Sequence, residues 1–195
     1  MEWDFLRAML LKMGICNKYT DMVMRCVTTA RCAVRVNGCR TASFTPTRGI
    51  RQGAEGRPYL FVLCASGFSA MLRLKEERKV LRGVRFGNVG ITHLFFADDS
   101  IIFVEASARG IDELKDVLSR DEAASGQKVN QAKSSMIFGS SCPVSIRAMV
   151  KEKLHIDREA LNETYLGLPS SVGRLKGEAF HTIMDQVENQ VKWVE

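Results

Sequence analysis

Apolar residues recur at helical spacing in several stretches of the chain. Trp3, Leu6, Leu10 and Met13 predict a first helix over 2–13, which Gly14 would end. A second helix is expected from about residue 17, with a buried stripe of Tyr19, Met22, Val23, Cys26, Val27 and Ala30. Four more helices are predicted by the same spacing, from Pro58 to about residue 80 and over 109–125, 144–153 and 180–191.

Extended runs alternate with these helices. The pair Asn37-Gly38 tolerates positive φ angles and predicts a tight hairpin between strands 33–36 and 39–44. Further strands are expected over 83–86, 91–96, 101–104 and 133–138. Helices interleaved with hairpin strands indicate an α+β fold in which an antiparallel sheet carries helices on one face.

The composition is that of a globular protein. With 195 residues, 46% of them hydrophobic, the chain can bury a core. No apolar run approaches the roughly 18 residues of a membrane span, and no secretion signal opens the chain. We therefore expect a soluble protein of the nucleus or cytoplasm that needs no membrane. The six cysteines lack zinc-ligand spacing and are interpreted as reduced, mostly buried thiols.

Charge is unevenly distributed along the chain. The net charge is +6, but twelve Lys and Arg against three Glu between Arg31 and Gly90 give that stretch +9 and leave −3 elsewhere. A basic stretch of this kind suits a phosphate backbone, and a solvated basic face is the alternative.

Two adjacent acids, Asp98 and Asp99, lie between two of the predicted apolar strands. At the tip of a hairpin both carboxylates can approach one cation, and hard ions such as Mg²⁺ prefer oxygen ligands. Such a pair suits the two-metal chemistry of phosphoryl transfer. The alternative is an ordinary acidic turn, since Asp is common in turns.

Five motifs follow one another in a fixed order around these acids. They are Arg51-Gln52-Gly53, Pro58-Tyr59-Leu60-Phe61, Phe96-Ala97-Asp98-Asp99, Gly126-Gln127-Lys128-Val129-Asn130 with Lys133-Ser134-Ser135, and Tyr165-Leu166-Gly167. In this order the chain resembles the reverse transcriptases of plant-type LINE (non-LTR) retrotransposons. The resemblance implies an RNA-directed DNA polymerase, with a partial palm over 1–140 and the primer-grip region and start of a thumb over 141–195.

The resemblance also implies roles for individual residues. Asp98 and Asp99 would be catalytic ligands of Mg²⁺ or Mn²⁺, and Lys133 would assist the departing pyrophosphate. Arg51, Gln52 and Gly53 would contact the incoming deoxynucleotide and the RNA template. Tyr165, Leu166 and Gly167 would grip the DNA primer. Taken singly, Arg51-Gln52-Gly53 is compatible with an ordinary loop, Lys133 with a solvated surface lysine, and Tyr165 with a partly buried aromatic side chain.

Two departures from the family bear on activity. Family members usually continue the Arg-Gln-Gly triplet with Asp-Pro-Leu-Ser-Pro, whereas this chain has Ala54-Glu55-Gly56-Arg57-Pro58. Relatives also carry an upstream strand with a first metal-binding Asp, and Asp4 does not match it. We therefore expect this nucleotidyltransferase fragment to bind metal weakly and to be inactive alone. The alternatives are a non-catalytic nucleic-acid-binding remnant and a decayed open reading frame, and the sequence does not define an oligomeric state.

The three histidines, His93, His155 and His181, have no nucleophile or metal partner at recognisable spacing. We interpret them as structural or solvated side chains.

Overall fold

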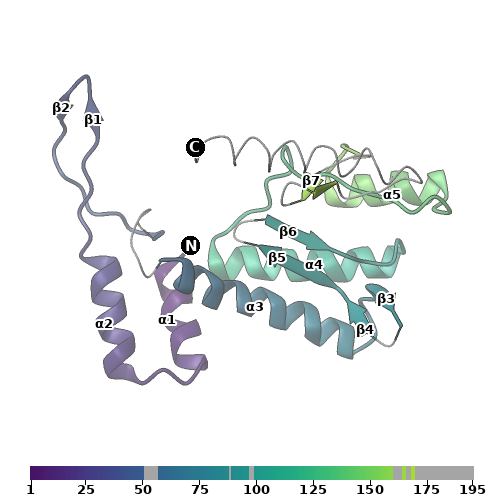
Figure 1. The fold of residues 1–195 in the computed structure, drawn as a ribbon, viewed down its shortest axis with the longest axis horizontal. Coiled ribbons are helices and arrows are strands. Elements are labelled where there is room, and N and C mark those ends of the chain that lie inside the picture. The colour runs from purple at the N-terminus through teal and green to yellow at the C-terminus, as the bar shows by residue number, and fades with distance from the viewer. Residues whose placement is uncertain (51–56, 88, 97–98, 160–163, 166–167, 170–195) are drawn as a thin grey trace, which may run out of the picture.

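A computed structural model describes residues 1–50, 57–87, 89–96, 99–159, 164–165 and 168–169 (Figure 1). Within these residues the chain forms five α-helices and eight short strands. The strands pair as four separate two-stranded antiparallel ribbons. The predicted mixture of helices and antiparallel hairpins is therefore confirmed, whereas the described residues do not form the single sheet that we expected.

The first helix, α1 (Trp3–Lys12), matches the sequence prediction. Leu6 and Leu10 are fully buried, and Gly14 follows the helix with φ 83°. The fourth residue of the predicted stripe, Met13, is instead 42% exposed. The helix therefore buries its two central leucines and ends in solvent.

The second helix, α2 (Asn17–Thr28), lies where it was predicted, but its buried stripe was partly wrong. Tyr19 and Met22 are more than half exposed, and Cys26 is exposed as well. The expectation that the cysteines are mostly buried was therefore also wrong: of the six, Cys64 is buried, whereas Cys16, Cys26 and Cys39 are exposed. Thr20 and Met24 are the buried residues of this helix. The reason is that α2 packs along α1, so a narrow side of the helix is covered rather than the whole apolar stripe.

The hairpin at Asn37-Gly38 is confirmed with shorter strands than predicted. Strand β1 (Arg35–Val36) pairs with β2 (Cys39–Arg40), and Asn37 and Gly38 both have positive φ, as a type I′ turn requires. One further bridge joins Cys32 to Phe44. Residues 31–45, which we call the arm, extend away from the rest of the chain (Figure 1).

A long helix, α3 (Arg57–Glu77), follows and ends slightly before the predicted limit. Beside it lies α4 (Ala108–Ser125), whose N-terminus is capped by Ser107: the amide of Gly110 donates to its Oγ at 3.1 Å. Gly126 ends α4 with φ 70°, as predicted. Sequence signals for helix ends were thus accurate here.

Two hydrophobic clusters form the core. One gathers around α1 and the first half of α3 with the buried residues Leu6, Leu10, Met24 and Cys64. The other lies between α3 and α4 with the buried residues Leu72, Leu81, Leu114 and Val117. Because α3 contributes to both clusters, it connects the two halves of the molecule.

The strand predicted over 91–96 is divided at Thr92. Strand β4 (Val89–Ile91) pairs with β3 (Val84–Phe86), and β5 (His93–Phe96) pairs with β6 (Asp99–Ile102). Thr92 is buried, and its hydroxyl donates to Glu76 Oε2 at 3.4 Å. A buried polar residue with partners on a helix fixes the chain at the point where the two ribbons separate.

The remaining described elements are α5 (Val144–Leu154), β7 (Thr164–Tyr165) and β8 (Leu168–Pro169). Helix α5 confirms its prediction and is joined to α4 by Lys153 and Asp112, whose Nζ and Oδ1 are 2.6 Å apart. The strand predicted over 133–138 was wrong, because Lys133 lies in a turn and only Met136 forms a bridge, with Glu159.

The helix predicted over 180–191 lies outside the described residues. Of the helices that are described, none is both long and apolar enough to cross a membrane.

Candidate active site

The β5–β6 hairpin carries one of the two predicted metal ligands. Phe96 pairs with Asp99, so two residues, Ala97 and Asp98, connect the paired strands. The predicted hairpin is confirmed and is tighter than expected, because Asp99 is already the first residue of β6. Asp98 itself lies outside the described residues.

The register of the hairpin defines its two faces, since directly opposed residues of an antiparallel pair point to the same side. Phe95 and Ile102 pack against the cluster between α3 and α4, and the Phe95 ring stacks on Phe68 with centroids 5.4 Å apart. This inner face anchors the hairpin on the helices beneath it (Figure 1).

The outer face of the hairpin carries Leu94, Phe96, Ile101 and Asp99. Leu94 is 44% exposed, Phe96 is 57% exposed, and Asp99 is exposed as well. The carboxylate of Asp99 is thus held at the exposed end of a surface that is otherwise apolar. This arrangement leaves an oxygen ligand accessible to a cation or a substrate.

A chain of polar contacts supports the hairpin from below. The ring of His93 lies 2.7 Å from Ser69 Oγ through Nε2 and 3.0 Å from Thr92 Oγ1 through Nδ1. Burial, and then the positive charge of Arg73, lower the pKa of His93, while Glu76 acts in the opposite direction. The ring therefore favours its neutral form and helps to fix the hairpin on α3, as expected for a structural histidine.

Sequence reasoning missed this network, although a signal for it was present. Thr92-His93 is a polar pair inside an otherwise apolar run, and such a pair often marks buried hydrogen bonding. Its partner Glu76 lies on α3, and no local pattern specifies that pairing.

A complete metal centre is not assembled by the described residues. No group of three or more His, Cys, Asp and Glu side chains comes together among them. Of the predicted pair, the described residue Asp99 offers one hard oxygen ligand that suits Mg²⁺, and Asp98 would supply a second. The predicted pairing of these two carboxylates stays a prediction.

Lys133 lies in an exposed turn. Its amide donates to the side-chain oxygen of Asn130 at 3.2 Å and to the main-chain oxygen of the same residue at 3.1 Å. Within the described part of the chain no ion pair joins Lys133 to Asp99. Its proposed role toward pyrophosphate thus depends on a substrate that reaches both side chains.

The segment predicted to grip the primer is a hairpin in its described parts. Tyr165 of β7 pairs with Leu168 of β8, which leaves Leu166 and Gly167 as the connecting residues. Those two residues, and Arg51, Gln52 and Gly53, lie outside the described residues.

Comparisons with known proteins agree with the resemblance seen in the motifs. A family model described as reverse transcriptase (RNA-dependent DNA polymerase) matches residues 2–170. The chain belongs to the reverse transcriptase family. It is also 43% identical over 67 residues to an uncharacterized mitochondrial protein of Arabidopsis thaliana. That match covers 33% of this chain and 55% of the relative, so the chain spans about half the length of the protein it matches.

Proposed function

We propose that the chain acts within a LINE-like retrotransposon reverse transcriptase that copies an RNA template onto a DNA primer. In this proposal residues 1–140 belong to the palm and residues 141–195 to the primer-grip region and the start of the thumb. The family match over residues 2–170 supports the reaction class. The order of the five motifs supports the retrotransposon type.

The observation that carries the proposal is the register of the β5–β6 hairpin. It holds Asp99 at the exposed end of the ribbon, with Asp98 next to it in the chain and only two residues in the turn. Two divalent ions about 3.5–4 Å apart would activate the primer hydroxyl and stabilise the leaving oxygen. The protein contributes a carboxylate held on a hairpin that is anchored by packing beneath it.

The other motifs would position the substrates. Arg51, Gln52 and Gly53 would lie beside the nucleotide and template, where arginine pairs with phosphate and glycine permits close approach. Tyr165, Leu166 and Gly167 would hold the primer end. Lys133, whose side chain is exposed, would neutralise charge on pyrophosphate.

A first prediction tests the metal site with Mn²⁺ as the probe. We expect Mn²⁺ to broaden the amide NMR signals of β5, β6 and their connection at concentrations that leave other signals sharp. Binding should be weak, because two carboxylates make an incomplete ligand set. The double variant Asp98→Asn plus Asp99→Asn should abolish the broadening.

The matched control removes two acids elsewhere, by Glu152→Gln plus Asp157→Asn. Both are exposed residues of the α5 region, so the loss of net negative charge is the same. Broadening that persists in the Asp98 and Asp99 variant, or that centres on another part of the chain, would contradict the proposed site.

A second candidate function is binding of nucleic acid by a remnant without synthesis, and the third possibility is a decayed open reading frame with no selected activity. Of these two alternatives, the uneven charge of the chain favours the nucleic-acid-binding remnant. Primer extension that requires both acids would support the polymerase. Salt-dependent binding of an RNA–DNA hybrid that survives Asp98→Ala plus Asp99→Ala, without extension, would support the binder.

A further inference from the structure

The whole net charge of the chain is concentrated in one segment. Residues 22–54 contain six basic residues and no Asp or Glu, and the 22 remaining Lys and Arg are balanced by 22 Asp and Glu elsewhere. The six basic residues are Arg25, Arg31, Arg35, Arg40, Arg48 and Arg51. The net charge of +6 is thus the charge of this segment alone.

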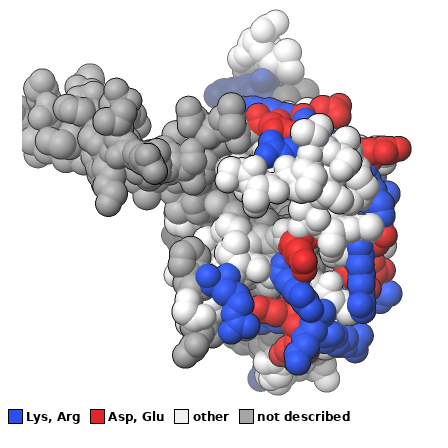
Figure 2. All heavy atoms as spheres, turned by 90° about the vertical axis from the view of Figure 1, so that its right-hand side faces the viewer, with Lys and Arg blue, Asp and Glu red and all other residues white. Residues whose placement is uncertain are grey.

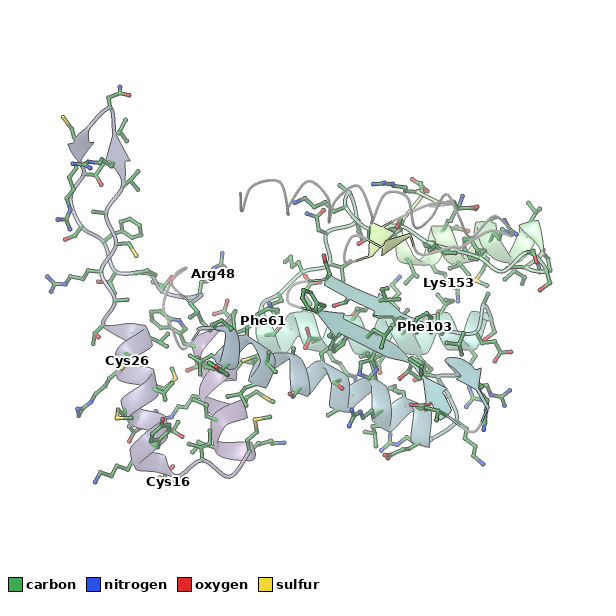
Figure 3. All side chains as sticks on the ribbon, in the orientation of Figure 1. Cys16, Cys26, Arg48, Phe61, Phe103 and Lys153 are labelled. Carbon is green, nitrogen blue, oxygen red and sulfur yellow. The ribbon has the colours of Figure 1, made fainter. Side chains whose placement is uncertain are left out.

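The structure sets the middle of this segment apart as the arm. The arm leaves the end of α2 and projects beyond the helices (Figure 1), and its side chains extend outward on both sides of the ribbon (Figure 3). Arg48 lies at the base of the arm (Figure 3), where its Nη1 is 3.6 Å from Glu2 Oε1.

On the face that Figure 2 shows, basic residues are mixed with acids. Figure 2 views the molecule from the side of the β3–β4 hairpin and the end of α3, and there Lys and Arg side chains are interleaved with Asp and Glu. Arg82 pairs with Glu105 at 3.9 Å, and Arg120 pairs with Asp116 at 2.8 Å. These two arginines are thus paired with carboxylates of the protein itself.

The arm arginines differ in this respect within the described part of the chain. Among the residues that the structure places, no carboxylate oxygen lies within 4.0 Å of Arg31, Arg35 or Arg40. Arg35 Nε donates to the main-chain oxygen of Gly38 at 3.3 Å. A polyanion would therefore meet these guanidinium groups without displacing a carboxylate of the described residues.

The register of the arm places two of these charges against each other. Arg35 is directly opposite Arg40 in the β1–β2 pair, so both side chains point to the same face of the ribbon. Like charges directly opposite each other destabilise an antiparallel pair. With Arg31 they line a hollow of about 500 Å³ that is otherwise formed by Cys32, Ala33 and Val34. An anion held in this hollow would relieve the repulsion.

We propose that the arm binds the phosphate backbone of a nucleic acid, with Arg31, Arg35 and Arg40 around the hollow each neutralising one phosphate. That the partner is a primer–template duplex rests on the proposed function. The shape of the arm favours a polymer over a single nucleotide. From Cys32 to Asn37 an extended ribbon is about 17 Å long, which matches about five phosphates of one strand at about 3.4 Å of helix axis each.

The experiment measures binding of a fluorescent RNA–DNA hybrid by anisotropy at a series of salt concentrations. The arm variant carries Arg31→Gln, Arg35→Gln and Arg40→Gln. The matched control carries Arg7→Gln, Arg82→Gln and Arg120→Gln, three arginines that each pair with an acid. Both variants lower the net charge by the same amount, so bulk charge alone predicts equal losses of affinity.

We expect the arm variant to bind more weakly and its plot of log K against log salt to become shallower by about 2.7, which is about 0.9 for each phosphate that the arm no longer neutralises. The control should change the slope by less than a third of that. Hydrogen exchange gives a second measurement on the unaltered chain. Amides of residues 31–41 should exchange more slowly when the hybrid is bound, whatever the variants do to folding.

Three outcomes would each overturn the inference. They are equal losses of affinity in the two triple variants, no loss in the arm variant, and no binding of the hybrid by the unaltered chain. Its failure is distinguishable from failure of the proposed function. Binding of the hybrid tests the arm, whereas Mn²⁺ at Asp98 and Asp99 tests the proposed active site.

Discussion

Single polar residues determine how the β5–β6 hairpin packs on α3. Thr92 and His93 share hydrogen bonds with each other and with Glu76 and Ser69 of α3. The position of Asp99 on the outer face depends on these contacts, because a shift of the strand by one residue would turn the Asp99 side chain inward. Residues without a chemical role thus decide which way a candidate ligand points.

The second prediction concerns pH and His93. Burial lowers the pKa of His93 below its usual 6.5, so the folded state favours the neutral ring. The unfolded chain then takes up a proton more readily than the folded chain. The contribution of the neutral His93 ring to the unfolding free energy is therefore fully present above pH 6.5. It is lost as the pH falls through the lower pKa that His93 has in the folded state.

Urea unfolding between pH 8 and pH 5 would measure this effect. We expect the unfolding free energy of the unaltered chain to fall more with decreasing pH than that of His93→Gln, whose side chain does not titrate. His155→Asn is the control, because His155 is exposed and has φ 55°, which Asn tolerates. Parallel pH profiles for the unaltered chain and His93→Gln would contradict the prediction.

At the level of elements, helices were predicted well and strands less well. Local signals specify helix ends, as Ser107 and Gly126 show for α4. Strand partners are set by residues distant in sequence, which is why the division at Thr92 was not foreseen and why residues 133–138 do not form a strand. A hairpin at the two acids could be anticipated from their place between apolar runs, but the early start of β6 at Asp99 could not. The outward direction of Asp99 required the register.

The third prediction tests the packing of α3 against α4. Leu72 is fully buried between them, whereas Leu74 on the same helix is 44% exposed. Leu72→Ala should lower the unfolding free energy by about 2–5 kcal/mol, because it removes buried apolar atoms and leaves a cavity. Leu74→Ala should change it by about 0.5 kcal/mol or less. Chemical denaturation of both variants is the measurement, and similar losses of stability would show that the two sites are equally covered.

The molecule as a whole has two hydrophobic clusters connected by one helix. Cys64 of α3 belongs to the cluster at α1, and Leu72, two turns further along, belongs to the cluster at α4. Opening either cluster exposes part of α3, so the clusters are expected to unfold together. The labelling rate of a thiol buried in one cluster can therefore measure the unfolding of both.

The fourth prediction uses Cys64 as that reporter. Cys64 is 2% exposed, and its burial raises its pKa to about 11, so its reactive thiolate is scarce at pH 8. Cys26 on α2 and Cys16 just before this helix are both exposed. We expect iodoacetamide to label Cys16 and Cys26 readily in the folded protein, and Cys64 only at the rate of global unfolding. Peptide mass spectrometry would measure each site, and equal labelling rates would rule out the shared core.

The ribbon of the arm has a consequence for solubility. Within the part of the chain that the structure places, β1 and β2 pair only with each other, so both edges of the ribbon are open. Val34 and Val36 are each more than half exposed beside those edges. Open apolar edges favour pairing between copies and aggregation, which repulsion between charged side chains opposes. Arg35 and Arg40 therefore keep neighbouring copies apart at the same position where they repel each other within one ribbon.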